Sequence, residues 1–445
     1  MPFDSDYLLT SDPAREIFDA VRDLKIIDSH SHADPAAIAE DRPPRDLWEL
    51  TAATDHYVWE LERKCGVDEE FITGSRPPFE KFREFARVFP LMAGNPVYDW
   101  TCLDLRRRLG FDGELRADNA EAVWNAAAGC DLRPSKLLEN VEVLCTTDDP
   151  ADDLAFHTPG GRVLPTWRPD RYLNIAAPGW LKCVERLGRK FNLAIDSLPK
   201  LEEALRLSHR FFGERGSAVS DYGLTRPLAG EPAPEAAAVI MKTALASDTV
   251  STAEAEVFAS HLFNFCCELD AADGRVAQLH IGAERNVRTS LFDRIGPDAG
   301  GDTMNLAISL FPALPRFLDR FDSRLKVVIY CLDPAHQLTV AGLCRAFGAN
   351  VRTGAAWWLC DSPSGIRRQL QVAADVDLLC MHPGMVSDSR KLMSFDSRFE
   401  LFRRTLADFL GELVIRGRLS VTSARMAARR VSYDNPKEFF FPRRS

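Results

Sequence analysis

Apolar runs long enough to cross a bilayer are missing from this sequence of 445 residues, and so is a signal-peptide start. The first six residues lack both the basic cluster and the apolar stretch of a secretory leader. Basic blocks are absent too, and the formal net charge is −10, which argues against a nucleic-acid partner. We therefore expect a cytoplasmic protein that binds neither membranes nor nucleic acid.

Short cysteine spacings are also lacking. None of the eleven cysteines forms a Cys-x-x-Cys pair, although Cys266 and Cys267 are adjacent. Disulfide frames and structural zinc sites are normally built on such repeated spacings, so neither is expected here. What is present, 46% apolar and 27% charged residues, is typical of an ordinary globular protein.

Eight short apolar or β-branched segments recur along the chain, and a polar residue and a longer helical pattern follow most of them. They occupy residues 25–32, 141–149, 161–168, 217–221, 275–280, 326–333, 350–358 and 378–388. Apolar strands that alternate with helices predict a buried parallel sheet. Eight such units predict an α/β fold of the (β/α)8 TIM type, with its active site at the carboxyl ends of the strands.

The first two predicted strands are separated by far more residues than a normal connection needs. Residues 36–140 have a helical pattern, with amphipathic stretches such as 78–86. We therefore predict that residues 36–140 form a helical insertion, or lid subdomain. Residues 1–35 and 141–445 then form the barrel.

Histidines and an aspartate stand at the ends of three predicted strands. His30 and His32 end the first strand, and residues i and i+2 of a strand share a face, so their imidazoles can converge. His280 ends the fifth strand and Asp388 the eighth. A structural, hydrogen-bonded imidazole is the stronger interpretation of His280 taken alone. Together the four residues favour one divalent metal ion, with zinc expected and one position open to water or substrate.

Further motifs accompany these residues in a fixed order, and together they resemble the uronate isomerase family of the amidohydrolase superfamily. They are Asp55-His56-Tyr57, Gly94-Asn95-Pro96, Arg168-Pro169-Asp170, Ser220-Asp221, Arg285-Asn286, Gly296-Pro297-Asp298, Trp357-Trp358 and Ser387-Asp388-Ser389-Arg390. The resemblance extends from residue 28 to about residue 390. It implies an isomerase that interconverts D-glucuronate or D-galacturonate and the keto form by proton transfer through an enediol.

The resemblance also implies roles for individual residues. Asp388 would take the proton of the C5 hydroxyl when the sugar ring opens. The three histidines, with any bound metal ion, would surround the reacting oxygens, and Tyr57 and Arg390 would assist the proton transfer or polarise the carbonyl. The residues that would bind the substrate are His56, Arg168, Asp221, Arg285 and Trp357, because arginine forks suit a carboxylate.

Purely structural interpretations are also open for Arg168 and for the helix that carries His56 and Tyr57. Arg168 can be a surface ion pair. The helix that carries His56 and Tyr57 can simply bury the tyrosine ring and expose the histidine. The chain also departs from the family at Asp99, Cys102 and Tyr222, where relatives commonly carry histidine. We expect these three positions at the periphery of the pocket, where they can alter the choice of substrate.

Two other functions are compatible with the same residues. The first is a metal-dependent hydrolase that acts on an acidic sugar or another carboxylate, with water activated by the metal. The second is an inactive sugar-acid binder, which has no need of the acid and base residues. Three candidate clamp arginines (Arg168, Arg285 and Arg390) favour the isomerase. The sequence does not decide whether the metal is required, which uronate is used, or whether copies of the chain form a homo-oligomer.

Overall fold

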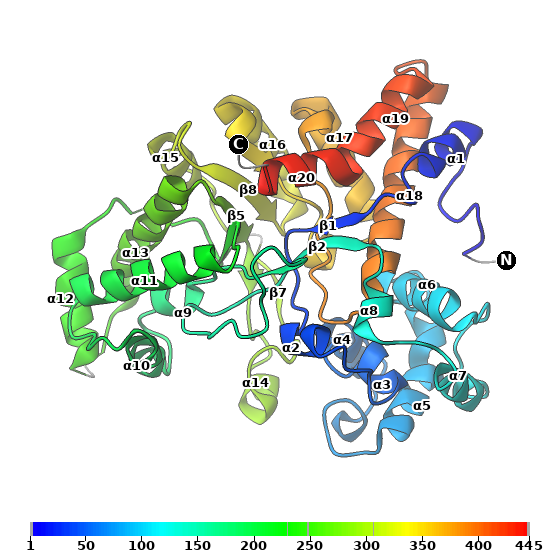
Figure 1. The fold of residues 1–445 in the computed structure, drawn as a ribbon, viewed down its shortest axis with the longest axis horizontal. Coiled ribbons are helices and arrows are strands. Elements are labelled where there is room, and N and C mark those ends of the chain that lie inside the picture. The colour runs from blue at the N-terminus through cyan, green and yellow to red at the C-terminus, as the bar shows by residue number, and fades with distance from the viewer. Residues whose placement is uncertain (1–2, 229, 247–248, 306, 443–445) are drawn as a thin grey trace.

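Parallel strands and surrounding helices form the centre of the molecule in the computed structural model, which describes residues 3–228, 230–246, 249–305 and 307–442 (Figure 1). The first sheet has the order β1 (Ile26–Asp28), β2 (Val141–Cys145), β3 (Val163–Leu164). The second has the order β4 (Val219–Leu224), β5 (Val276–Ile281), β8 (Lys326–Cys331), β9 (Val351–Thr353). Every neighbouring pair in these two sheets is parallel.

Contacts outside the ladders link the two sheets on one side and place the last barrel segment against β1 on the other. Trp167, just after β3, forms parallel bridges with Asp148 and Ser220. On the other side, the amide of Asp388 donates to the carbonyl of His30 at 3.1 Å. The chain thus forms the TIM-type barrel that the sequence predicts.

The eighth predicted strand, residues 378–388, is not a regular strand. It begins with the 3₁₀ turn η6 (Leu379–Met381), and the residues that follow carry no ladder. Pro383 has no amide hydrogen to donate, and Gly384 has a φ of +91°, which a strand does not accommodate. This irregular segment nevertheless occupies the eighth position, beside the end of β1.

Residues 36–140 contain no strand and are largely helical, as predicted. The helices are α2 (Pro35–Ala39), α3 (Leu47–Thr51), α4 (His56–Lys64), α5 (Pro78–Val88), α6 (Pro96–Leu109), α7 (Ala120–Ala127) and α8 (Pro134–Leu137). Val58 and Phe82 of this segment belong to the same buried cluster as Ile26 and Val141 of the barrel. Its status as a separate lid subdomain stays a prediction.

The remaining helices surround the strands. They are α1 (Asp12–Asp19), α9 (Asp170–Leu173), α10 (Trp180–Phe191), α11 (Leu198–Glu214), α12 (Pro234–Leu245), α13 (Thr252–Asp273), α14 (Thr289–Ile295), α15 (Ala313–Arg320), α16 (Gln337–Phe347), α17 (Pro363–Val376), α18 (Ser394–Ile415), α19 (Val421–Arg429) and α20 (Asn435–Phe440). A short antiparallel ribbon, β6 (Ala283–Glu284) with β7 (Thr303–Met304), follows β5. The described residues contain no helix with the length and apolar character of a membrane span.

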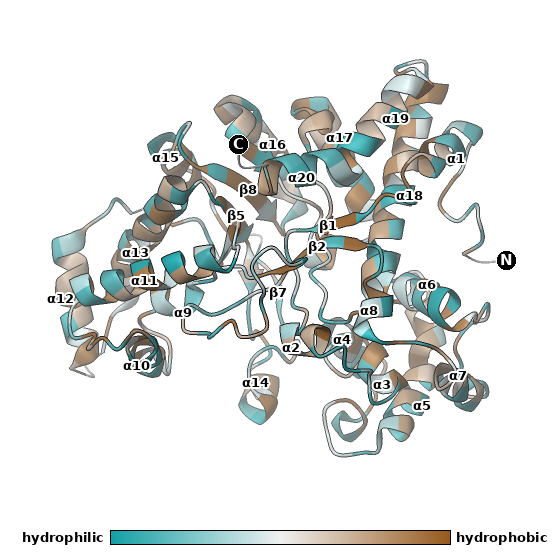
Figure 2. Cartoon of the chain, viewed as in Figure 1, coloured by the Kyte–Doolittle hydropathy of each residue, from teal (hydrophilic) through white to brown (hydrophobic). Residues whose placement is uncertain are grey.

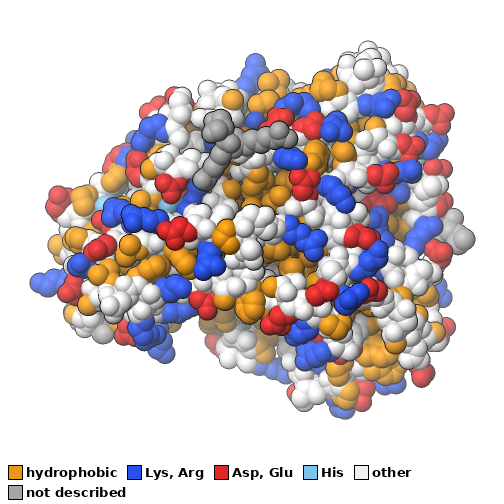
Figure 3. Space-filling model, in the orientation of Figure 1, with side chains coloured by type: hydrophobic (Ala, Val, Ile, Leu, Met, Phe, Trp, Pro, Cys, Tyr) orange, Lys and Arg blue, Asp and Glu red, His pale blue; other side chains and the backbone are white. Residues whose placement is uncertain are grey.

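The distribution of apolar residues explains the layering. All six residues of β5 are buried, and β1, β5 and β8 are predominantly apolar in Figure 2, whereas the outer helices have hydrophilic faces. On the face shown in Figure 3, acidic and basic side chains are interspersed. All eleven cysteines are free thiols in the structure.

Candidate active site

Two histidines at the end of one barrel segment lie against one carboxylate oxygen at the end of another. His30 and His32 follow β1, and their Nε2 atoms lie 3.1 and 3.2 Å from Oδ1 of Asp388. Asp388 has a φ of +49°, a conformation that aspartate adopts more readily than most residues. Burial raises the pKa of its carboxyl, but hydrogen bonds and charge from the two histidines outweigh this effect and hold the pKa well below its usual value. The carboxylate is therefore ionised.

The other oxygen of Asp388 accepts hydrogen bonds from two aromatic side chains. The Tyr57 hydroxyl donates to Oδ2 at 2.7 Å, and the Trp357 indole donates to it at 3.1 Å. Tyr57 lies in the first turn of α4, where the side chain of Asp55 caps the helix by accepting from the Tyr57 amide at 3.0 Å. Burial raises the pKa of the Tyr57 phenol well above its usual value, so this hydroxyl keeps its proton.

A second group of residues lies behind His30. The Nδ1 atom of His280 is 2.6 Å from Oδ1 of Asp221, and Nδ1 of His30 is 3.5 Å from the other oxygen of Asp221. Arg168 reaches this oxygen at 3.0 Å and holds the pKa of the Asp221 carboxyl below its usual value, against the effect of burial. Arg168 is largely buried, with its side chain 21% exposed, so the alternative of a surface ion pair is wrong.

His280 has one nitrogen available for a ligand. Burial lowers its pKa to about 4, so the ring is neutral, and Nδ1–H can donate to Asp221. Its Nε2 has no hydrogen-bond partner among the described residues, and the ring stacks on Tyr330 at a centroid distance of 4.4 Å. A histidine oriented by a carboxylate, with the other nitrogen free, is a common arrangement at metal sites.

The donor atoms fall into two overlapping sets, each within 4.8 Å. One set is His30, His32 and Asp388, and the other is His30, Asp221 and His280. The four predicted ligands therefore divide between two groups that share His30. Imidazole nitrogens and carboxylate oxygens suit a divalent ion such as zinc, so the residues of this site fit a metal ion.

The other predicted binding residues gather around α4. The ring of His56 stacks on Tyr57 at 4.8 Å, and burial lowers its pKa, with Arg390 and Arg285 among the neighbouring charges. His56 is 8% exposed, so the interpretation that α4 exposes it to solvent is wrong. The Arg285 guanidinium lies 4.4 Å from the ring of Trp358.

The three arginines do not form a single clamp. Arg168 binds Asp221 in the inner group, whereas Arg285 and Arg390 lie near His56. Arg285 also pairs with Asp302 at 3.0 Å, and Arg390 lies 3.7 Å from Asp298. The arginines that could meet an acidic sugar therefore lie in two separate regions, each with carboxylates as neighbours.

The expectation that Tyr222 lies at the pocket periphery is wrong. Successive side chains of a strand face opposite sides, so Asp221 points into the barrel and Tyr222 points out. The Tyr222 hydroxyl donates to Oδ2 of buried Asp270 at 2.6 Å, and its ring packs against Phe263. Asp99 and Cys102 lie on α6, with Tyr7 and Tyr98 as neighbours.

Sequence reasoning missed two buried cations that support Asp388 and Tyr57. Lys391 pairs at 2.8 Å with Asp55, the residue that caps α4. Arg398 donates to the carbonyl of Ser387 at 2.8 Å and lies 3.8 Å from the ring of Trp100. Lys391 follows Asp388 within one short segment, which is a usable signal. Arg398 lies within a helical pattern, where a charged residue usually faces solvent.

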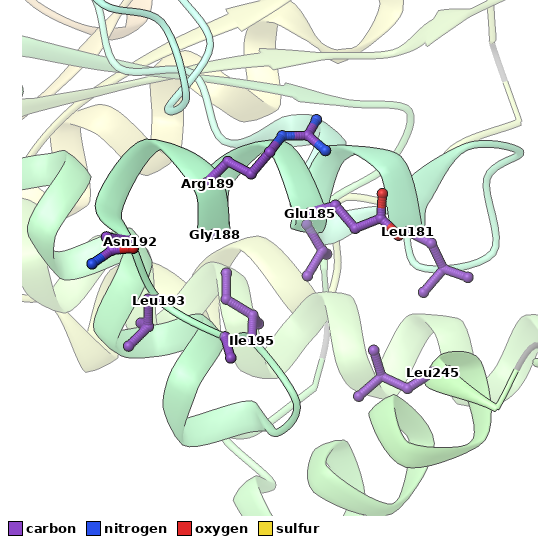
Figure 4. Close-up of a pocket in the computed structure, with 10 residues that line it drawn as sticks. Leu181, Glu185, Gly188, Arg189, Asn192, Leu193, Ile195 and Leu245 are labelled. Atoms are coloured by element: carbon purple, nitrogen blue, oxygen red, sulfur yellow. The ribbon is translucent and has the colours of Figure 1, made fainter.

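A cavity of about 720 Å³ lies away from these residues, between α10 and the end of α12 (Figure 4). Leucines 181, 193 and 245 contribute to its lining, together with Glu185 and Arg189. No predicted site residue lines it, so it is separate from the histidine cluster.

Comparison with known proteins gives a consistent result. The family model described as glucuronate isomerase matches residues 1–440. Uronate isomerase of Thermotoga petrophila is 43% identical over 446 residues, which cover 98% of this chain and 99% of the relative. The crystal structure of uronate isomerase from Thermotoga maritima has a TM-score of 0.97 at 42% identity, covering 99% of this chain and 100% of the other. The crystal structure of glucuronate isomerase from Caulobacter crescentus has a TM-score of 0.94 at 26% identity, covering 100% and 98%.

Proposed function

This chain belongs to the glucuronate isomerase family, and we propose that it interconverts D-glucuronate or D-galacturonate and the corresponding keto acid. The reaction moves a proton between C2 and C1 through an enediol. The observation that carries the assignment to this site is the contact of one ionised carboxylate, Asp388, with two histidines and a tyrosine. The hydrolase alternative is not favoured, because the matched relatives are uronate isomerases.

Asp388 is the proposed base for ring opening. Because its pKa lies well below the usual value, the carboxylate is ready to accept the proton of the C5 hydroxyl. His30 and His32 lie against the same carboxylate and can share the proton that it receives. The open-chain aldehyde is the form on which C2 to C1 proton transfer takes place.

Tyr57 and Arg390 are the proposed partners of the enediol step. The raised pKa of Tyr57 keeps its hydroxyl protonated, so it can donate to an oxygen that gains negative charge. Arg390 is two residues from Asp388 in the chain, and its guanidinium offers several N–H donors for an oxygen that gains negative charge. A divalent ion, with zinc proposed, would be held by His30, His32 and Asp388, and when bound it would act as a Lewis acid on the substrate oxygens.

Recognition of the substrate's carboxylate and hydroxyls is assigned to Arg168, Arg285 and His56, and Trp357 and Asp221 contribute to the walls of the site. A guanidinium fork matches a carboxylate with two parallel hydrogen bonds, which a neutral sugar cannot make. This chemistry supports an acidic sugar as substrate. The choice between the two uronates is left to the experiment below.

The helical segment 36–140 is the proposed lid subdomain. Its helix α4 supplies His56 and Tyr57, and Asp55 ties that helix to Lys391. Free thiols are consistent with the cytoplasm as the proposed location. A homo-oligomer stays an expectation.

The function is tested with a panel of substrates. The purified chain, supplied with zinc, is incubated with D-glucuronate, D-galacturonate and D-glucose, and with an ester of a uronate. We expect a keto acid from at least one uronate, no ketose from glucose and no hydrolysis of the ester. Hydrolysis without ketose formation would transfer the assignment to the hydrolase.

A further inference from the structure

Arg403, on α18, is a buried cation without a counter-ion. It is 4% exposed and has no carboxylate within 4 Å in the described ranges. Its Nη atoms donate to the carbonyls of Arg22 at 3.3 Å and Lys25 at 3.0 Å, while its Nε atom has no partner there. Burial also lowers its pKa to about 10. A buried charge is costly unless it is paired, so this arginine calls for an explanation.

Arg352 is a useful comparison within the same chain. Burial lowers its pKa to about 10 as well, and no carboxylate lies within 4 Å of it among the described residues. Its guanidinium, however, lies 4.0 Å from the ring centroid of Phe439, and a cation over an aromatic face is stabilised electrostatically. No such ring is found for Arg403 in the described part of the chain, so its compensation is limited to two backbone carbonyls and to carboxylates that lie beyond ion-pair distance.

A polar cavity adjoins Arg403. Its volume is about 240 Å³, and Ile26, the first residue of β1, and Asn140, which precedes β2, contribute to its lining. The cavity therefore lies at the amino ends of the strands, opposite the end that carries His30 and Asp388. Pockets for organic metabolites usually begin at about 300 Å³, so this one suits a smaller ligand.

The charges around the cavity leave an excess of one cation. Four arginines line it, at positions 22, 107, 403 and 404, together with three carboxylates, Asp23, Asp396 and Glu400. Each carboxylate already has an arginine partner. Asp23 lies 3.5 Å from Arg22, Glu400 accepts from Arg404 at 2.8 Å, and Asp396 lies 3.6 Å from Arg107, which also pairs with Glu400. The guanidinium left over is that of Arg403.

We propose that this cavity binds one small inorganic oxyanion of the phosphate class, with Arg403 as its principal contact. Guanidinium groups bind phosphate oxygens through charge-assisted hydrogen bonds. The amino ends of TIM-barrel strands serve stability, whereas the carboxyl ends carry the chemistry. The bound anion therefore stabilises the fold and takes no part in the isomerase reaction.

The test compares thermal unfolding of the full-length chain in sodium phosphate and in sodium chloride, at equal ionic strength and pH. In phosphate at tens of millimolar, we expect the wild type to unfold about 2 °C higher or more, because a ligand of the folded state raises Tm. Arg403→Met is expected to lose this shift. Arg352→Met is the matched control and is expected to keep it, and kcat of the wild type is expected to be the same in both salts.

Each other outcome overturns the proposal. An equal shift in all three proteins would show a general salt effect, and no shift in the wild type would show that phosphate does not bind. Should Arg403→Met fail to fold, Arg107→Gln provides the same test, because it removes one cation and leaves Asp396 and Glu400 facing the cavity. Retention of the full shift in Arg107→Gln would then count against the site.

Discussion

The hydroxyl of Tyr57 donates a 2.7 Å hydrogen bond to the carboxylate of Asp388, although the two residues are 331 positions apart. Tyr57 belongs to the helical segment that follows β1, and Asp388 to the irregular segment that completes the barrel. Their contact joins a protonated phenol to an ionised carboxylate inside a buried site. This pairing of acid and base is the centre of the proposed mechanism.

Asp388→Asn removes the proposed base and keeps the shape of the side chain. We expect kcat to fall by about 10³-fold, because general bases contribute rate factors of about 10² to 10⁴. Binding of the uronate should persist, as measured by calorimetric titration with the variant. Near-normal turnover would remove Asp388 from the mechanism.

Tyr57→Phe deletes only the hydroxyl that contacts Asp388. Turnover should decrease by about 10²-fold while KM changes little, because the phenol acts on the enediol and not on the carboxylate clamp. Tyr98→Phe is the matched control, since its hydroxyl donates to Glu114 on the far side of the helical segment. Equal losses in the two variants would mean that the effect is structural.

Gly223→Ala tests the position of Arg168 without changing any charge. A Cβ atom at residue 223 would lie 2.6 Å from Nη2 of Arg168 and 2.8 Å from Oδ2 of Asp170, so the guanidinium must move. We expect KM for the uronate to rise about tenfold, the loss typical of one charge-assisted hydrogen bond. Gly342→Ala, where no atom lies within 4 Å of the added methyl, should leave KM unchanged. An unaltered KM in Gly223→Ala would exclude Arg168 from substrate binding.

Zinc loading of the wild type and of histidine variants tests the proposed metal ligands. After zinc loading and desalting, elemental analysis should give about one ion per chain, the number that one closed His–His–Asp set can hold. His32→Asn should retain much less zinc, because it removes one of the nitrogens that converge on Asp388. His209→Asn, whose ring pairs with Asp270 outside the site, should load normally. Equal loading of the two variants would contradict the assigned ligands.

The stability of the chain should fall between pH 4 and pH 7 in part because of Asp104. Burial raises the pKa of this carboxyl to about 7, from about 3.8 in the unfolded chain. The folded state therefore binds the proton more tightly, its stability contribution is complete below pH 4, and it is lost as the pH rises toward 7. The cost at pH 7 is on the order of 4 kcal/mol.

Urea unfolding of Asp104→Asn at pH 4 and pH 7 measures this contribution. The variant should lose less stability across the interval than the wild type, because its amide does not ionise. Asp118→Asn, at an exposed position, serves as the control and should follow the wild type. A pH dependence in Asp104→Asn equal to that of the wild type would contradict the raised pKa.

The residues predicted at strand ends lie together in the structure as a candidate site, but the buried cations next to them were not predicted. His30, His32 and His280 were predictable because parallel strands deliver their carboxyl ends to one edge. The eighth segment was predicted as a strand from its apolar residues, although His382, Pro383 and Gly384 interrupt that pattern and the Pro-Gly pair is a turn signal. The barrel was predictable from repeated strand and helix units, whereas the contact between its first and last segments depends on two backbone hydrogen bonds. The amide of Asp388 donates to the carbonyl of His30, and the amide of His32 donates to the carbonyl of Ser389.

The inward or outward direction of a strand residue was harder to predict than its position. Tyr222 follows Asp221 directly, yet it faces Asp270 outside the barrel. The buried charge of Arg398 could not be predicted from the helical pattern in which it lies, whereas Lys391 follows Asp388 closely in the chain. Their burial depends on partners such as Asp55, which come from distant parts of the chain.

Heavy-water proton NMR with the active uronate tests the central claim most directly. The account predicts that the keto acid appears and carries solvent deuterium at C1, because a side-chain base that takes the proton from C2 can exchange it with solvent before a proton is returned to C1. A keto acid formed without any solvent deuterium, even at early times, would indicate direct transfer between the two carbons or a fully shielded proton. No keto acid from either uronate, in the presence of zinc, would contradict the isomerase itself.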